Sequence, residues 1–156
     1  MAAATSERGH RLVVGVDGSP ASLEALEWAA GLAGSTGAAV EVLATWSWPS
    51  GYGASLVVPA GYDPAADAEV MVTNAVERVR SRHPDVEFVP VIVEGRPAPV
   101  LVEASKGADL LALGSRGHGE VAGMLLGSVS EHCAAHAHSP VLVIGDRAVR
   151  DHAGAS

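Results

Sequence analysis

Apolar and polar residues follow two patterns along the chain, which together predict that strands and helices alternate. Five short apolar runs, rich in Val, Leu and Ile, are typical of strands buried on both faces. Between them, apolar residues recur every three or four positions, as in amphipathic helices. The predicted strands cover 11–16, 39–45, 86–93, 109–113 and 140–144. The predicted helices begin at Ser19-Pro20, Asp63-Pro64, Pro97 and Ser128, and they end near Gly34 or Gly37, His83, Lys106 and Ala137.

Local signals support several of these boundaries. Ser19 precedes Pro20, and a serine cap followed by a proline in the first helical turn is a favourable helix start. Gly107 closes the third helix as a glycine C-cap does. Pro90 lacks the N–H that a central strand needs, so the third strand is expected at an edge of the sheet.

The order of the elements predicts the fold class. Strands that alternate with crossover helices form an α/β fold with a doubly wound, five-stranded parallel sheet and helices on both faces. We expect one domain over 11–145, flanked by flexible tails at 1–10 and 146–156, and a long loop over 46–62. In such sheets ligands bind beyond the carboxyl ends of the strands, where the strand order switches. The segments after the first, second and fourth strands are therefore the candidates for a site.

Composition and charge exclude several classes of function. The chain has 156 residues, of which 48% are hydrophobic and 18% charged, so it can bury a core of its own. One cysteine rules out an internal disulfide framework, and no apolar run is long enough for a secretory signal or a membrane span. We expect a cytoplasmic protein. The net charge of −8 argues against binding to nucleic acids or anionic membranes.

A glycine-rich segment after the fourth strand carries the clearest chemical signal. Gly114 is expected to let the chain turn off the strand, and Gly117 to let backbone amides approach an anion closely. Gly127 and Ser128 stand at the start of the last helix, where free N–H groups and the helix dipole favour a phosphate. Ser128 and Glu131 match the spacing of a capping box.

These motifs resemble those of the universal stress proteins, in particular the branch that binds ATP. The resemblance covers roughly 11–145 and rests on three segments in the right order. They are Val13-Val-Gly-Val-Asp17-Gly-Ser-Pro-Ala-Ser22, the spacing Gly114-x2-Gly117-x9-Gly127-Ser128, and Ser139-Pro-Val-Leu-Val-Ile144. It implies the strand order 3-2-1-4-5 and a fold like that of the adenine nucleotide α-hydrolases.

The resemblance also implies which residues would hold a nucleotide. Asp17 would contact the adenosine region, and the backbone around Thr45 would meet the edge of the adenine. Trp46 and Trp48 are candidates for a wall of the adenine pocket. The implied binding residues are Gly15, Val16, Asp17, Thr45, Leu113, Gly114, Arg116, Gly117, Gly127, Ser128, Val129 and Ser130, with the last four cradling the phosphates. Asp17 has a second interpretation, as a carboxylate that satisfies local amides before the first helix.

Three functions remain open on these residues. The first is a nucleotide-dependent regulator of the stress response that binds ATP with Mg²⁺, and the second is a slow ATPase. The third is an interaction module of the same family that binds no nucleotide. A P-loop string of the G-x-x-x-x-G-K-[ST] type is absent, and the glycines follow the fourth strand rather than the first, which disfavours a dinucleotide enzyme. The resemblance further implies a homodimer through the last strand, Val141–Ile144.

The last helix raises one further hypothesis. His132 and His136 are one turn apart, and Cys133 lies beside them, a set that resembles metal ligands. The alternative, which we favour, is packing or incidental surface placement, with Cys133 and His136 facing inward. No residue near Cys133 in the sequence marks it as an activated thiol.

Overall fold

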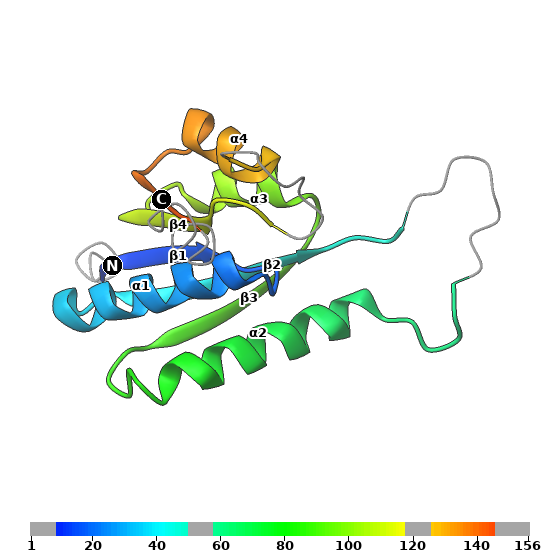
Figure 1. The fold of residues 1–156 in the computed structure, drawn as a ribbon, viewed down its shortest axis with the longest axis horizontal. Coiled ribbons are helices and arrows are strands. Elements are labelled where there is room, and N and C mark those ends of the chain that lie inside the picture. Colours follow the sequence, from blue (N-terminus) through cyan, green and yellow to red (C-terminus); the bar gives the residue numbers. More distant parts are fainter. Residues whose placement is uncertain (1–8, 50–57, 118–125, 146–156) are drawn as a thin grey trace, which may run out of the picture.

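The computed structural model of the chain describes residues 9–49, 58–117 and 126–145, which form one sheet flanked by helices (Figure 1). The strands are β1 (Arg11–Gly15), β2 (Ala39–Trp46), β3 (Phe88–Glu94), β4 (Leu110–Gly114) and β5 (Val141–Ile144). The helices are α1 (Pro20–Thr36), α2 (Pro64–Arg80), α3 (Pro97–Ala104) and α4 (Ser128–His136). The predicted tails lie outside the described residues, except for Gly9 and His10.

The sheet has the predicted topology. Its five strands are all parallel and lie in the order β3-β2-β1-β4-β5. The chain moves outward from β1 to β2 and β3, and then crosses back to β4 on the other side of β1. Pro90 lies in β3, at an edge of the sheet as predicted, where a missing N–H costs no ladder bond on the open side.

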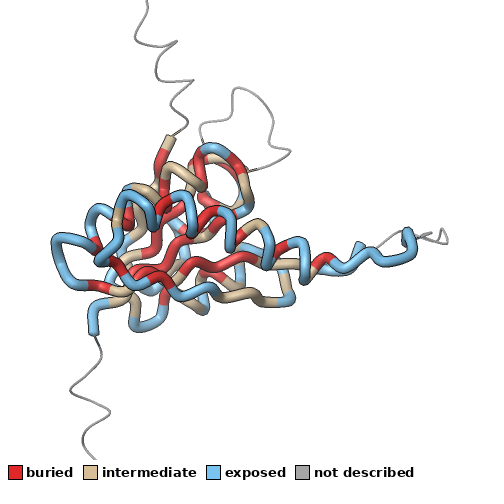
Figure 2. Tube along the Cα trace, turned by 90° about the horizontal axis from the view of Figure 1, so that it is seen from below, coloured by how far each residue is buried: buried red, intermediate tan, exposed pale blue. Residues whose placement is uncertain are grey.

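Two hydrophobic layers enclose the sheet. Leu12 and Val14 of β1 pack with α1 and α2 on one face, while Val13 packs with α3 and α4 on the other. All three are at most 4% exposed, which confirms that β1 is buried on both faces. Figure 2 shows the buried positions concentrated in the central strands and alternating with exposed ones along the helices.

The helix starts follow the local chemistry of the sequence. The Ser19 hydroxyl accepts a hydrogen bond from the Ser22 N–H at 3.3 Å, with Pro20 in the first turn of α1. The Asp63 carboxylate accepts from the Ala66 N–H at 3.1 Å and caps α2 in the same way. Each cap satisfies a donor that has no acceptor within the helix, so these two boundaries come from local bonding.

The end of α2 and the start of β3 differ from the prediction. The helix ends at Arg80 and the strand begins at Phe88, because turns that include a bond from the His83 N–H to the Val79 carbonyl fill the interval. Arg82 and His83 in these turns both contact the carboxylate of Glu27 on α1, at 2.8 and 2.9 Å. The hydrogen bond from Arg82 holds the pKa of Glu27 below its ordinary value. The two helices on this face are therefore tied to one another by charge as well as by packing.

Replacement of Gly114 by alanine should destabilise the fold. A Cβ on Gly114 would lie 2.8 Å from the backbone of Ala21 and Ser22 in α1, where backbone atoms have little room to yield. We expect a loss of about 1–3 kcal/mol in the free energy of unfolding, measured by urea denaturation. Gly31→Ala is the matched control, because that position opens to solvent and the change favours the helix by about 1 kcal/mol. Equal stability of Gly114→Ala and the unmodified chain would contradict the close packing.

Candidate functional site

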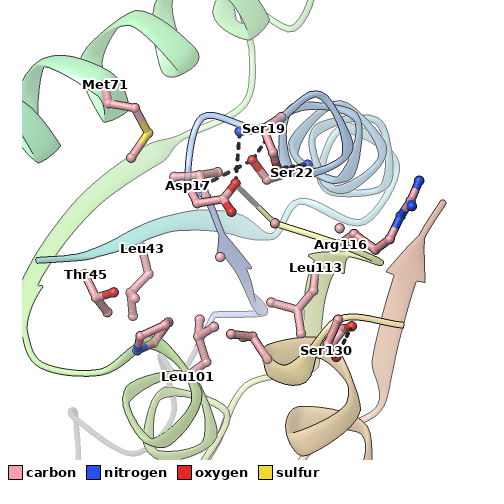
Figure 3. Close-up of a pocket in the computed structure, with 17 residues that line it drawn as sticks. Asp17, Ser19, Ser22, Leu43, Thr45, Met71, Leu101, Leu113, Arg116 and Ser130 are labelled. Atoms are coloured by element: carbon pink, nitrogen blue, oxygen red, sulfur yellow. Dashed lines mark hydrogen bonds between the residues drawn. The ribbon is translucent and has the colours of Figure 1, made fainter. Parts of the chain in front are cut away.

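A pocket of about 300 Å³ opens at the carboxyl edge of the sheet, where the chain diverges on the two sides of β1 (Figure 3). The ends of β1, β2 and β4 and the starts of α1, α3 and α4 all contribute to its wall. Its volume is within the range of small-molecule sites. The lining residues are Gly15, Val16, Asp17, Ser19, Ser22, Leu43, Thr45, Met71, Pro97, Leu101, Leu113, Gly114, Arg116, Gly117, Gly127, Val129 and Ser130.

Most of the residues predicted from the sequence meet in this pocket. The residues at the end of β1 and just after it are Gly15, Val16 and Asp17, and β2 contributes Thr45. The end of β4 and the segment after it contribute Leu113, Gly114, Arg116 and Gly117, and the start of α4 contributes Gly127, Val129 and Ser130. Ser128 does not line the pocket: it is the exposed first residue of α4. Residues more than a hundred positions apart therefore share one wall.

Asp17 lies where two segments of the wall meet. Its Oδ1 accepts a hydrogen bond from the Ser19 N–H at 2.9 Å, and its own N–H donates to the Ser22 hydroxyl at 3.3 Å. Its Oδ2 lies so close to Gly117 that it leaves no room for a Cβ on that residue. Asp17 thus satisfies a local amide, as the second interpretation expected, and also lines the pocket with an exposed side chain.

The glycines of β4 and its extension act through close contacts. Gly114 ends β4 and is followed by a bend at Ser115 and Arg116, although its own backbone is not left-handed. Its missing side chain admits the start of α1. Gly117 admits the carboxylate of Asp17 in the same way. At each of these two glycines, a neighbouring group fills the space that a side chain would need. The segments that form the wall of the pocket therefore pack closely against one another.

The first turn of α4 differs from the predicted capping box. Gly127 is the N-cap, no side chain caps the helix, and Ser128 is already its first residue. The Gly127 N–H donates to the Ser115 carbonyl at 2.6 Å. The first N–H groups of a helix have no acceptor within it, so the start of α4 presents backbone donors and a positive dipole end to the pocket.

Six lining residues were missed by the sequence analysis. Ser19 and Ser22 were read only as parts of the helix start, although both side chains are buried at the pocket wall. Leu43 lies two positions before Thr45 on the same side of β2, so strand periodicity would have identified it. Met71, Pro97 and Leu101 come from helices α2 and α3, which carry no local signal for this site.

The prediction for the two tryptophans needs correction. Trp46 and Trp48 do not line the pocket: their rings contact one another edge to face, and Trp48 also contacts Tyr62, beyond the end of β2. The second tryptophan is 52% exposed. Arg116 does line the pocket, but its guanidinium extends away from the pocket centre (Figure 3).

The histidines and the cysteine of α4 lie apart from the pocket. Cys133 is fully buried in the layer beneath α3 and α4, whereas His136 is exposed, so the expectation that His136 faces inward was wrong. The rings of His132 and His136 are 4.5 Å apart. Among the described residues, no group of three or more His, Cys, Asp or Glu side chains is arranged to hold a metal ion. None of the helices in the same ranges is long and apolar enough to span a membrane.

A family model for the universal stress proteins matches residues 9–145, which cover all the described elements. The chain belongs to the universal stress protein family. Two universal stress proteins of Mycobacterium tuberculosis are 38% identical to it over 135 residues and 37% identical over 141 residues. Each match covers 85% of the chain but only 44% of the relative, so the chain spans less than half the length of these curated relatives.

Solved universal stress proteins have the same fold. One, crystallised in complex with cAMP, is 28% identical and superimposes with a TM-score of 0.67 over 88% of the chain and 98% of the solved one. Another, from Archaeoglobus fulgidus in complex with dAMP, is 23% identical with a TM-score of 0.63 over 86% of the chain and 97% of the solved one. The fold and the family predicted from the sequence are thus confirmed.

The thiol of this universal stress protein should be inert in the folded state. Burial raises the pKa of Cys133 to about 11, so the reactive thiolate is scarce at neutral pH. We expect alkylation by iodoacetamide to be slow in the native protein and fast in urea, followed by mass spectrometry. Because the thiol stays protonated in the folded state, stability should fall as the pH rises from about 9 toward about 11. Rapid native alkylation would show that the layer beneath α4 opens readily.

Proposed function

We propose that this universal stress protein domain binds an adenine nucleotide, ATP with Mg²⁺, and acts as a nucleotide-dependent regulator of the stress response. The observation that carries the proposal is the convergence of Asp17, Gly117 and the start of α4 on one pocket at the switch in strand order. Such switch points bind nucleotides in many doubly wound folds. The solved relatives crystallised with cAMP and dAMP support a nucleotide of this class.

The phosphates would lie against the first turn of α4. In an acidic protein with a net charge of −8, an anion needs local positive potential, and unpaired N–H groups at a helix start supply it. Arg116 directs its charge away from the pocket centre, so backbone donors rather than a side-chain cation would carry most of this contact. Mg²⁺ would be ligated mainly by phosphate oxygens and water, as is usual for this ion, with Asp17 as the nearest lining carboxylate.

The adenosine would occupy the apolar part of the pocket. Leu43, Met71, Leu101 and Leu113 contribute aliphatic surface from four different elements, and Thr45 adds a polar group at the end of β2. Asp17 lines the pocket beside Gly117, and its carboxylate would contact the adenosine region of the nucleotide. An apolar wall with a few polar groups suits a purine nucleoside better than a free phosphate.

Regulation is favoured over catalysis because the pocket holds groups that bind phosphate but few that would cleave it. Among the described residues that line the pocket, Asp17 is the one carboxylate, and its Oδ1 already accepts the Ser19 N–H. A slow ATPase remains the alternative, with Asp17 as the group that would help to activate water. Conformational or oligomeric change on binding would be the signal that other proteins detect.

Calorimetric titration of the purified chain with ATP and Mg²⁺ tests the proposal. We expect micromolar binding, equivalent to about −8 kcal/mol. Gly117→Val should abolish it, because the side chain would displace the Asp17 carboxylate from the pocket wall. Gly9→Val is the matched control, since a Cβ on Gly9 would have no atom within 4 Å, and this variant should bind ATP like the unmodified chain. If ATP, ADP, AMP and cyclic AMP all fail to bind the unmodified chain, the interaction-module function takes the place of this one.

We also propose that two copies of the chain associate through β5. This strand is an edge of the sheet, and Val141, Leu142 and Val143 are only half-buried, so its open side offers unpaired backbone groups beside apolar side chains. A charged side chain on β5 would be buried in this dimer and would destabilise it. Val143→Asp should therefore convert dimers into monomers in sedimentation velocity.

Val89→Asp provides the control for this prediction. Val89 lies on β3, the opposite edge of the sheet, and is 38% exposed. This variant should stay dimeric. A dimer that survives Val143→Asp and dissociates in Val89→Asp would move the interface to the other edge.

A further inference from the structure

Ser130 is buried at the pocket wall, and its hydroxyl is directed into the protein backbone. The residue is only 2% exposed. Its Oγ donates to the Ser115 carbonyl at 2.8 Å, and the Gly127 carbonyl lies within 3.1 Å of the same hydroxyl. The bond to Ser115 links the first turn of α4 to the residue that follows β4.

The Ser115 carbonyl receives two donors and is itself fixed to the sheet. The Gly127 N–H donates to it at 2.6 Å, beside the bond from Ser130. The Ser115 N–H donates to the Ile144 carbonyl at 2.7 Å, and Ser115 is 8% exposed. Ser115, Gly127 and Ser130 therefore form a buried anchor that joins the start of α4 to the ends of β4 and β5.

A direct bond from the Ser130 hydroxyl to a phosphate is disfavoured on chemical grounds. A hydroxyl has one proton, and Ser130 gives it to a backbone carbonyl, which leaves only lone pairs on the oxygen. Ionised phosphate oxygens are also acceptors, so the two groups would repel one another. If the Ser130 hydroxyl donated to a phosphate instead, the buried Ser115 carbonyl would keep the Gly127 N–H as its donor and lose the bond from Ser130.

We infer that Ser130 is a positioning residue, which holds the first-turn amides of α4 at the distance from β4 that a phosphate group requires, without contacting the phosphate itself. This inference rests on the proposed nucleotide function and separates the roles of the residues at the start of α4. The backbone N–H groups bind the anion, and the Ser130 hydroxyl fixes where they lie. Preorganisation of this kind raises affinity because the donors need no rearrangement on binding.

The test compares ligands with and without a phosphate, and includes a measurement on the ligand-free protein. AMP and adenosine are titrated into the unmodified chain and into Ser130→Ala. Loss of the hydrogen bond should weaken AMP binding about five- to tenfold and leave adenosine binding unchanged. In the ligand-free protein, hydrogen exchange of the Gly127 N–H should become faster, because the carbonyl that accepts it is no longer held by Ser130.

Ser105→Ala is the matched control. Ser105 is also buried, at 0% exposure, and its hydroxyl joins two backbone segments by donating to the Val102 carbonyl and accepting from the His138 N–H. It does not line the pocket. This variant should lose stability to a similar degree without any change in the ratio of AMP to adenosine affinity.

Each other outcome overturns the inference in a recognisable way. Unchanged AMP binding in Ser130→Ala would show that the anchor does not matter for the ligand. Weaker AMP binding with unchanged exchange at Gly127 would identify Ser130 as a direct phosphate contact. Equal weakening of adenosine would indicate a general distortion of the pocket. If the unmodified chain binds neither AMP nor adenosine, the proposed function fails, whereas faster exchange at Gly127 would still establish the anchor itself.

Discussion

The parallel pairing of β1 with both β2 and β4 is the constraint on which the rest of this structure depends. Because β1 is buried on both faces and has a neighbour on each side, the chain must leave its carboxyl end toward one layer and return to β4 from the other. The helices that follow β1 and β4 then diverge, and a hollow is left between their first turns. The pocket is a geometric consequence of that strand order.

Three glycines allow the segments around this pocket to pack closely against one another. Gly15 faces the side chains of Leu101 and Leu113, Gly114 faces the backbone of α1, and Gly117 faces Asp17. A side chain at any of the three would displace a neighbour that also lines the pocket. These three glycines therefore serve both the packing of the sheet against its helices and the shape of the pocket. A substitution at any of them is expected to change both stability and ligand binding.

The electrostatic character of the site differs from that of the whole molecule. The chain is acidic, and the side-chain cation at the pocket wall, Arg116, extends outward. Positive potential inside the pocket comes instead from the start of α4, whose orientation the buried bonds to Ser115 maintain. In the proposed function, such an arrangement would hold an anion at one point without making the surface attractive to polyanions.

The sequence by itself determined the order of the elements, the parallel sheet and the edge position of Pro90, because hydrophobic periodicity and capping chemistry act over a few neighbouring positions. Most of the pocket residues followed from the resemblance of its motifs to those of the universal stress proteins. Its glycine spacing also identified the segment that meets Asp17. Only the tertiary structure decided that Gly114 makes room for α1, that Met71 and Leu101 close the pocket, and that Trp48 lies outside it. It also decided that Ser130 bonds to Ser115 while Ser128 faces solvent. These contacts join residues far apart in the chain, and local pattern carries no information about which distant backbone a side chain will meet.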